Sequence, residues 1–282
     1  MNSGNPDVVA FIGGGNMASA IIGGLVRQGL PASQIEVVEP FADAREKLRT
    51  QFSLQAQATA GASLQRASLV IWAVKPQTFH DAATQAAPFT RGALHLSVAA
   101  GIRSDSIAAW TGTQRIVRSM PNTPALVGKG MTALFARAAV SDEDKRTVER
   151  VIATTGEMLW VDSEAHLDAV TALSGSGPAY VFFFLEAMTQ AGIEMGLTRE
   201  QSYRLAVGTF AGASELARAS QDPPEVLRQR VTSKGGTTYA AITSMEQDDI
   251  KALFVKALHA ARDRAQALGE EFAGDDAKMG PT

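Results

Sequence analysis

The strongest constraint on the fold is an alternation of short apolar runs with helix-like segments through the first half of the chain. Each apolar run is β-branched or aliphatic and is bounded by Gly, Pro or Ser, which is typical of a buried strand. The predicted strands are Val8 to Ile12, Ile35 to Val38, Leu69 to Val74, Leu94 to Val98 and Arg115 to Met120, and the predicted helices are Asn16 to Gln28, Ala42 to Gln51, Pro76 to Ala87 and Asp105 to Trp110. Buried strands that alternate with helices form a parallel sheet covered on both faces.

The pattern changes in the second half of the chain. Two further strands, Met131 to Phe135 and Met158 to Val161, flank a helix predicted for Ser141 to Thr155, and strand signals then stop at about Asp162. The remaining predicted helices are Pro178 to Met195, Arg199 to Ala219, Glu225 to Val231, Tyr239 to Gln247 and Asp249 to Leu268. We therefore expect an α/β chain with a parallel-sheet domain in residues 1–162, an all-α domain in residues 163–270 and a disordered polar tail in residues 271–282.

Several helices of the second half are rich in small residues and apolar on more than one face, so they must be buried on several sides. A helical domain of this size cannot easily bury all these faces by itself. The sequence therefore favours a second copy of the chain as partner. Packing against the first domain is the alternative that remains open.

Composition narrows the function classes. The chain has no cysteine, which excludes disulfides and thiolate nucleophiles and fits a reducing compartment. Its net charge is -3 with no long basic run, so nucleic acid and anionic membranes are poor partners. Met1 to Asp7 is polar and lacks the features of a signal peptide, and no apolar run approaches the roughly 20 residues that span a bilayer. We expect a cytoplasmic protein that acts on a small molecule.

A glycine-rich turn follows the first predicted strand and opens the first predicted helix. Gly13, Gly15 and Ala18 form the pattern G-x-G-x-x-A. The glycines permit a tight turn and let backbone N–H groups approach a pyrophosphate, while Ala18 keeps the helix close to the strand. The helix N-terminus adds partial positive charge. In this strand–turn–helix context the motif predicts a Rossmann-type dinucleotide site rather than a structural turn.

Glu39 ends the second strand, about 20 positions after the glycine turn, where an acidic residue usually accepts hydrogen bonds from the adenine ribose hydroxyls. Its charge would repel the 2′-phosphate of NADPH, so the sequence favours NADH. Two alternatives stay open. Glu39 could be a solvated strand end, or nearby Arg45 could accommodate the phosphate.

Further stretches carry a resemblance to a known family. They are Ala73-Val74-Lys75-Pro76-Gln77, Ser97-Val98-Ala99-Ala100-Gly101, Arg118-Ser119-Met120-Pro121-Asn122-Thr123-Pro124, Leu173-Ser174-Gly175-Ser176-Gly177-Pro178-Ala179-Tyr180 and Val231-Thr232-Ser233-Lys234-Gly235-Gly236-Thr237-Thr238. In order and spacing they closely resemble pyrroline-5-carboxylate reductase, from about Val8 to about Leu268.

The resemblance implies reduction of 1-pyrroline-5-carboxylate to L-proline by NADPH or NADH, the final step of proline biosynthesis. Members of that family join an N-terminal Rossmann-type domain to an all-α dimerisation domain. Their helical domains interlock in a homodimer, and the dimers often assemble into decamers. Their site lies where the Rossmann domain of one chain meets the helical domain of its partner.

The glycine motif and the resemblance together give the expected site. The expected cofactor contacts are Ile12, Gly13, Gly14, Gly15, Asn16, Met17, Glu39, Ala73, Val74, Lys75, Pro76, Ala99 and Ala100, of which the last two match the segment near the nicotinamide. The resemblance assigns the substrate carboxylate to Ser233 and to backbone amides around Gly235, Gly236 and Thr237, and it places the hydroxyl of Thr238, the expected catalytic residue, near the ring nitrogen. Glycines beside hydroxyl residues at a helix start can form an anion site, although an N-capped loop is the alternative.

Four departures from the family pattern bear on fine contacts. Glu39 stands where NADPH-using relatives commonly carry a small polar residue or Arg, and Ala60 stands where they commonly carry Asn. Both differences remove expected partners of a 2′-phosphate and favour tolerance of NADH. Arg230 replaces a common Asn, and Lys234 replaces a common Pro.

The sequence shows no constellation for strong acid–base or metal catalysis. The histidines His80, His95, His166 and His259 are scattered, and we expect each on the surface or in the core rather than in a metal site. Protonation of a cyclic imine makes the adjacent carbon electrophilic, so hydride transfer needs mainly alignment. Thr238 would orient the nitrogen, Lys75 is expected to line the cofactor, and Lys234 could steer an anionic substrate.

Two competing interpretations remain. Another reductase on the same architecture is disfavoured, because the second half has no convincing Lys-x-x-x-Asn pair of a β-hydroxyacid dehydrogenase, and an imine reductase for uncharged amines should lack the Ser233 to Thr238 anion site. A dinucleotide-binding sensor without turnover is the second alternative, and only an assay separates it from an enzyme.

Overall fold

The structure is a computed structural model that describes residues 8–278 of the chain. The predictions made for Met1 to Asp7 and for residues 279–282 therefore lie outside the described residues. The chain divides into two compact units, the first with residues up to Ser176 and from Ala261 onward, the second with residues Gly177–Ala260.

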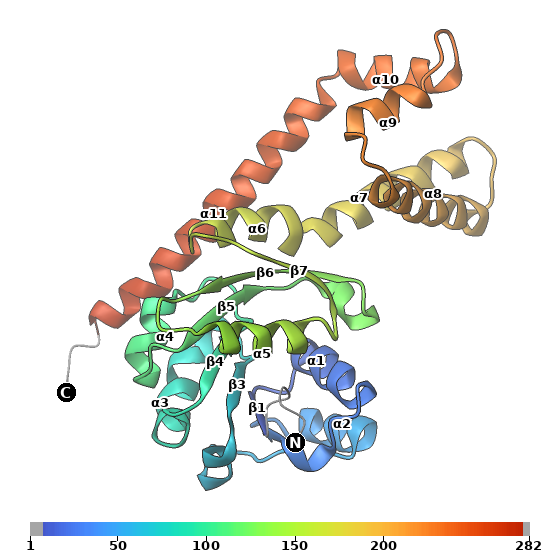
Figure 1. Cartoon of the computed structure of the whole chain (residues 1–282). Coiled ribbons are helices and arrows are strands. Elements are labelled where there is room, and N and C mark those ends of the chain that lie inside the picture. Colours follow the sequence, from blue (N-terminus) through green and yellow to red (C-terminus); the bar gives the residue numbers. More distant parts are fainter. Residues whose placement is uncertain (1–7, 279–282) are drawn as a thin grey trace. The chain divides into compact units, whose positions relative to one another are not determined.

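A seven-stranded sheet forms the centre of the first unit (Figure 1). Its strands are β1 (Val9–Ile12), β2 (Ile35–Val38), β3 (Leu69–Trp72), β4 (Leu94–Ser97), β5 (Ile116–Met120), β6 (Gly130–Ala136) and β7 (Gly156–Trp160), in the order β2-β1-β3-β4-β5-β6-β7. Every predicted strand is present with slightly shifted ends. The first five strands are parallel, as predicted, whereas β6 pairs antiparallel with β5 and parallel with β7. This reversal was not predicted.

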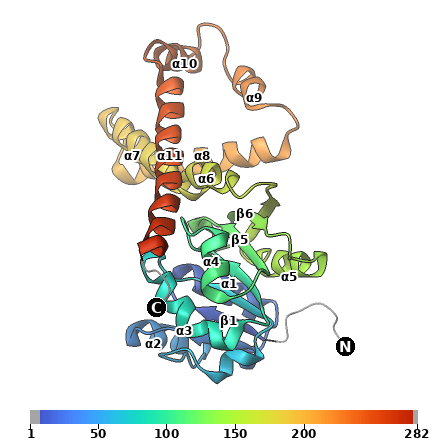
Figure 2. The same ribbon diagram turned by 90° about the vertical axis from the view of Figure 1, so that its left-hand side faces the viewer.

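Helices cover both faces of the sheet, as the apolar strands required (Figure 2). The helices of this unit are α1 (Asn16–Arg27), α2 (Ala42–Phe52), α3 (Phe79–Thr90), α4 (Ser104–Thr111), α5 (Asp142–Ile152) and α6 (His166–Val170), and a π-helical turn follows at Thr171–Gly175. One buried cluster joins one face of the sheet to α1 and α5, and the other joins the opposite face to α3 and α4. Ser141 caps α5 as predicted, since its Oγ accepts a hydrogen bond from the Asp144 N–H at 3.1 Å.

The second unit is helical, as predicted. Its helices are α7 (Gly177–Glu194), α8 (Arg199–Ala219), α9 (Pro224–Arg230), α10 (Thr237–Gln247) and the start of α11 (Ile250–Lys278). The rings of Tyr180 and Phe184 on α7 meet the Phe254 ring of α11 edge-on at 5.7 Å. Large apolar side chains of α7 and α8 stay exposed within the single chain, among them Phe182, Phe183, Leu205 and Leu216. Such a surface is typical of a protein interface and agrees with the expected second copy.

The boundary between the two compact units lies after Ser176, whereas the predicted boundary lies after residue 162. Residues 163–176 belong with the sheet, because Glu164 and Asp168 form ion pairs with Arg118 and Arg103. The end of α11 also belongs to the first unit, where the Phe272 side chain packs against Gly101. Residues 271–278, predicted as a disordered tail, continue helix α11. Among the described residues, no helix has the length and apolar character needed to cross a membrane.

His95 on β4 is fully buried in the core, which is one of the two locations, surface or core, that we expected for each histidine. Its Nδ1 accepts a hydrogen bond from Trp72 Nε1 at 3.1 Å, and its Nε2 lies 2.9 Å from the Thr90 carbonyl. A carbonyl can only accept, so Nε2 carries the proton and the ring is neutral. Burial lowers the pKa of His95 to about 4, and the hydrogen bond to Thr90 opposes that shift only in part.

We expect acid to destabilise the fold through His95. In the unfolded chain this ring takes up a proton below about pH 6.5, whereas the folded ring resists protonation until about pH 4, so stability present above pH 6.5 is lost between these values. The loss amounts to roughly 3 kcal/mol in the free energy of unfolding at pH 4. Urea denaturation across this pH range measures it. His95→Phe should flatten the dependence and His80→Gln should not; equal slopes in both variants would contradict the assignment.

Candidate functional site

The predicted cofactor residues converge at the carboxyl ends of four neighbouring strands. Ile12 ends β1, Glu39 follows β2, Ala73 to Pro76 follow β3, and Ala99 with Ala100 follow β4. In the sheet, β2 lies on one side of β1 and β3 lies on the other, which creates a switch point between β1 and β3. In open α/β sheets, ligands bind in the crevice at such a point.

The glycine turn has two geometrically different glycines. Gly13 has a φ of +97°, and a Cβ there would lie 2.5 Å from the Ala73 carbonyl oxygen, so only glycine fits. Gly15, the N-cap of α1, has a φ of -72°, and a Cβ there would meet nothing within 4 Å. The space beside Gly15 is therefore open, and no side chain caps the first N–H groups of α1. An open, uncapped helix N-terminus fits a pyrophosphate.

Glu39 is buried, with 5% of its surface exposed, so its interpretation as a solvated strand end is wrong. Its Oε2 accepts a hydrogen bond from the Gly14 N–H at 2.7 Å, and its Oε1 accepts one from the Phe41 N–H at 2.9 Å. The carboxylate thus ties the glycine turn to the end of β2. A fixed negative charge stands where the adenine ribose of a bound dinucleotide is expected.

The neighbours of Glu39 offer little to a 2′-phosphate. Arg45 Nη1 donates to the carbonyl oxygens of Glu39 and Pro40 at 2.9 and 2.6 Å, so that nitrogen braces the loop. Ala60 packs against the apolar cluster that contains Ile12 and supplies no polar side-chain atom. Phe41 is 73% exposed beside this loop.

The remaining predicted cofactor residues follow the strands β3 and β4. The Ala73 N–H donates to the Ile12 carbonyl at 2.8 Å, which continues the pairing of β1 with β3 beyond the strand ends. Lys75 is exposed and precedes a short 3-10 helix, Pro76–Thr78, that was predicted as the first turn of α3. After β4, the Ala99 N–H donates to Ser97 Oγ at 3.3 Å, and Ala99 itself is buried.

The predicted substrate residues form a separate set in the second unit, on the loop between α9 and α10. The Gly236 N–H donates to the Ser233 carbonyl at 3.0 Å, and Gly236 is the N-cap of α10. No side chain caps the first turn of α10, and no acidic residue lies in it, so the alternative of an N-capped loop is not supported. Thr238 is partly buried, whereas Ser233 and Lys234 are exposed. Arg230, one of the departures from the family pattern, pairs with Asp222 at 2.5 Å.

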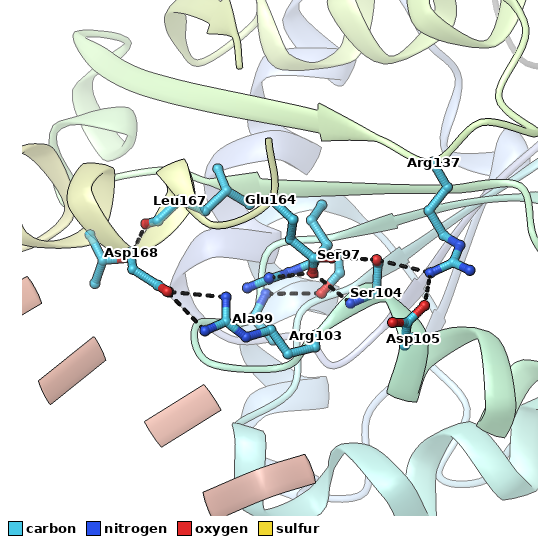
Figure 3. A network of polar contacts seen from close by, with 11 residues as sticks. Ser97, Ala99, Arg103, Ser104, Asp105, Arg137, Glu164, Leu167 and Asp168 are labelled. Atoms are coloured by element: carbon cyan, nitrogen blue, oxygen red, sulfur yellow. Dashed lines mark hydrogen bonds and ion pairs between the residues drawn. The ribbon is translucent and has the colours of Figure 1, made fainter. Parts of the chain in front are cut away.

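A polar network that was not predicted lies beside the loop after β4 (Figure 3). Glu164 accepts hydrogen bonds from the N–H and Oγ of Ser104, both at 2.6 Å, and from Arg118 Nη1 at 2.6 Å. Arg103 forms two hydrogen bonds with the carboxylate of Asp168. The available signal was Arg118, the charged residue of a strand that is otherwise uncharged, because a buried charge requires a partner.

Two family models match the chain. Residues 164–268 match pyrroline-5-carboxylate reductase dimerisation, and residues 8–101 match NADP oxidoreductase coenzyme F420-dependent. The first match supports a dimer as the building block, and the second supports a nicotinamide cofactor.

Curated relatives and solved structures agree with these models. The chain is 43% identical to pyrroline-5-carboxylate reductase of Pseudomonas aeruginosa over 94% of this chain and 97% of that protein, and 35% identical to that of Arabidopsis thaliana over 93% and 95%. A pyrroline-5-carboxylate reductase structure from Coxiella burnetii superposes with a TM-score of 0.86 at 36% identity, covering 93% of this chain and 98% of that one. The Plasmodium falciparum enzyme with NADP bound gives a TM-score of 0.83 at 28% identity, with coverages of 93% and 98%.

Proposed function

We propose a function from the premise that this chain belongs to the pyrroline-5-carboxylate reductase family. The chain is an oxidoreductase that reduces 1-pyrroline-5-carboxylate to L-proline, the final step of proline biosynthesis, with a nicotinamide dinucleotide as hydride donor. One observation carries this proposal: the matched residues 8–101 contain every proposed cofactor residue, and the matched residues 164–268 contain every proposed substrate residue. The sequence similarity therefore covers both halves of the reaction.

The cofactor half of the proposal rests on groups of the first unit. The uncapped N–H groups at Gly15, Asn16 and Met17 hold the pyrophosphate, and Glu39 faces the adenine ribose. The residues Ala73 to Pro76 border the cofactor, and Ala99 and Ala100 lie beside the nicotinamide. When bound, the nicotinamide supplies a hydride.

The substrate half rests on the loop before α10. Ser233 Oγ and the N–H groups of Gly235 and Thr237 bind the substrate carboxylate, because uncapped N–H groups at a helix start favour an anion. The Gly236 N–H donates to the Ser233 carbonyl and shapes the loop around that site. Thr238 Oγ1 donates a hydrogen bond to or accepts one from the ring nitrogen and holds the imine carbon toward the hydride. No strong general acid is required, since the protonated imine can be selected from solution and the remaining task is alignment.

Two finer points belong to the same proposal. The fixed Glu39 carboxylate and the apolar Ala60 let the enzyme accept NADH as well as NADPH. The exposed apolar faces of α7 and α8 are covered by a second copy of the chain. The family resemblance adds the assembly of such dimers into a decamer. In the dimer, the substrate loop of one chain completes the cofactor crevice of its partner.

The variants Ser233→Ala and Thr238→Val test the substrate half. Ser233→Ala removes one hydrogen bond to a carboxylate, so we expect KM for 1-pyrroline-5-carboxylate to rise about tenfold with the cofactor KM unchanged. Thr238→Val keeps the shape but loses the contact with the reacting ring, so we expect kcat to fall about tenfold. Steady-state kinetics with both substrates varied measures both effects.

Thr243→Val, on the same helix α10 away from the loop, is the matched control and should behave as wild type. Normal kinetics in both Ser233→Ala and Thr238→Val would remove this loop from the site.

A further inference from the structure

The loop that joins β4 to α4, residues 98–103, is held at its two ends by different groups. Its start is fixed by the sheet, because the Val98 N–H donates to the Trp72 carbonyl at 3.0 Å and Ser119 Oγ donates to the Ser97 carbonyl at 2.8 Å. Its end has no such backbone pairing. There the first residue of α4, Ser104, is held by a carboxylate from outside the loop, Glu164.

Glu164 makes three hydrogen bonds that join two elements. Its Oε1 accepts from the Ser104 N–H and from Arg118 Nη1, and its Oε2 accepts from Ser104 Oγ, all at 2.6 Å. Because α4 has no side-chain cap of its own, this carboxylate takes the place of one at the helix start (Figure 3). Arg118 is 4% exposed in strand β5, so the anchor of Glu164 is a rigid, buried cation.

A second carboxylate holds the residue before α4. Asp168, one helical turn after Glu164, accepts hydrogen bonds from Arg103 Nη2 at 2.8 Å and from Nη1 at 3.3 Å. The other side of the loop meets α11, where the Phe272 ring is in contact distance of Gly101. Gly101 has a φ of +77°, so the loop has a defined, left-handed turn between its two held ends.

We infer that Glu164 is a positioning residue for hydride transfer: by fixing Ser104 to Arg118 it sets the place of the loop that presents Ala99 and Ala100 to the nicotinamide. This inference rests on the proposed function, in which these two alanines lie beside the reacting ring. Glu164 does not touch substrate or cofactor and acts only through the loop. A displacement of about 1 Å at a reacting centre can lower a rate on the order of a hundredfold, so a held loop has kinetic consequences.

The groups around Glu164 keep its carboxylate ionised. Burial of Glu164 alone would raise its pKa, but the Arg118 charge and the hydrogen bonds from Ser104 and Arg118 outweigh burial and lower the pKa below its ordinary value. Asp105, Arg137 and Arg103 are the other charged groups around this network, and Arg137 forms an ion pair with Asp105 and a hydrogen bond with Ser104 Oγ. The Glu164 carboxylate is therefore negatively charged at the neutral pH of an activity assay.

The variants Glu164→Gln and Glu164→Asp test the inference in the full-length enzyme. Gln has a single side-chain oxygen that can accept hydrogen bonds, where the Glu carboxylate has two. Asp keeps the charge but is one methylene too short to reach Ser104 and Arg118 together. We expect kcat to fall about tenfold in both, with the dissociation constant of the cofactor near the wild-type value, because the Gly13 turn is untouched. The deuterium isotope effect on kcat with 4-deuterated NADH or NADPH should rise, since hydride transfer itself becomes slower.

Asp144→Asn is the matched control. Asp144 forms an ion pair with Arg115 at 2.7 Å, next to the start of β5, in which the carboxylate is largely buried and the Arg115 side chain is exposed. This variant should lose stability but keep the wild-type kcat and isotope effect. If the Glu164 variants likewise lose only thermal stability, with kcat per folded enzyme unchanged, Glu164 is purely structural and the inference is overturned.

Gly101→Ala separates failure of this inference from failure of the site assignment. Alanine is strained at a φ of +77°, so this variant distorts the loop without touching Glu164. A lowered kcat in Gly101→Ala together with normal kcat in the Glu164 variants would overturn the role of Glu164 alone. Normal kcat in Gly101→Ala would remove the loop from the neighbourhood of the nicotinamide and overturn the inference with it.

Discussion

Gly15→Ala is expected to weaken cofactor binding about 10- to 100-fold while changing the free energy of unfolding by less than about 1 kcal/mol. The reason lies in the geometry of the turn. The φ of Gly15 is ordinary and a Cβ there meets nothing within 4 Å, so alanine fits the protein without strain. The added methyl group instead occupies the open space in which the pyrophosphate is proposed to approach the helix N–H groups.

Gly13→Ala is expected to act first on the stability of the fold. Its φ of +97° is unfavourable for alanine, and the Cβ would lie 2.5 Å from the Ala73 carbonyl oxygen, so the fold itself must distort. We expect at least about 2 kcal/mol of lost stability, with cofactor binding lost as a consequence. The two variants therefore separate a contact with the ligand from a requirement of the fold.

Fluorescence titration with NADH and NADPH, together with urea denaturation, measures both quantities. Gly92→Ala is the control, because Gly92 is exposed, has open space around it and is remote in sequence from the turn. It should match the wild-type protein in both measurements. Unchanged cofactor affinity in Gly15→Ala would mean that the pyrophosphate does not bind at this turn.

Replacing Glu39 with Gln is expected to shift the preference between NADPH and NADH by about 100-fold toward NADPH. Two unit charges about 4 Å apart near a protein surface repel by about 4 kcal/mol, and we discount this value for partial screening by solvent. The shift arises because the Glu39 carboxylate is held in place by the Gly14 and Phe41 N–H groups and cannot turn away from a 2′-phosphate. The wild-type enzyme should accordingly use NADH well.

The ratio of kcat/KM for the two cofactors measures this effect. Glu36→Gln provides the control, since it makes the same change of charge within β2, three residues before Glu39, where Glu36 forms an ion pair with Arg66. It should leave the ratio unchanged. If Glu39→Gln also leaves the ratio unchanged, the carboxylate does not face the ribose and the proposed tolerance of NADH loses its basis.

Local patterns were sufficient to predict most of the sheet. The strands are short apolar runs between turn residues, and the helix starts at Asn16 and Ser141 follow from glycine geometry and capping, which act within a few residues. The direction of β6 could not be predicted, because the same apolar pattern suits a parallel or an antiparallel strand. The extension of α11 past residue 270 was not predicted, because the polar composition of the segment gives no sign that Phe272 lies against Gly101, a residue far away in the sequence.

The residues of the proposed site could be predicted from the sequence, but the contacts between them could not. The positions of Gly13, Gly15 and Glu39 follow from one motif, yet the hydrogen bond from the Gly14 N–H to Glu39 joins residues 25 positions apart and required the fold. The Arg118–Glu164 pair spans 46 positions for the same reason. A charged residue in a buried strand predicts that a partner exists, but only the packing of the segment around α6 identifies which carboxylate it is.

The most direct test of the central claim is the oxidation of NADH or NADPH by the purified protein in the presence of 1-pyrroline-5-carboxylate, followed by nicotinamide absorbance with L-proline identified as the product. We expect rapid oxidation that depends on the substrate, with NADH accepted. Cofactor binding without oxidation of either cofactor would contradict it and would identify the chain as a dinucleotide-binding sensor or a reductase of another substrate.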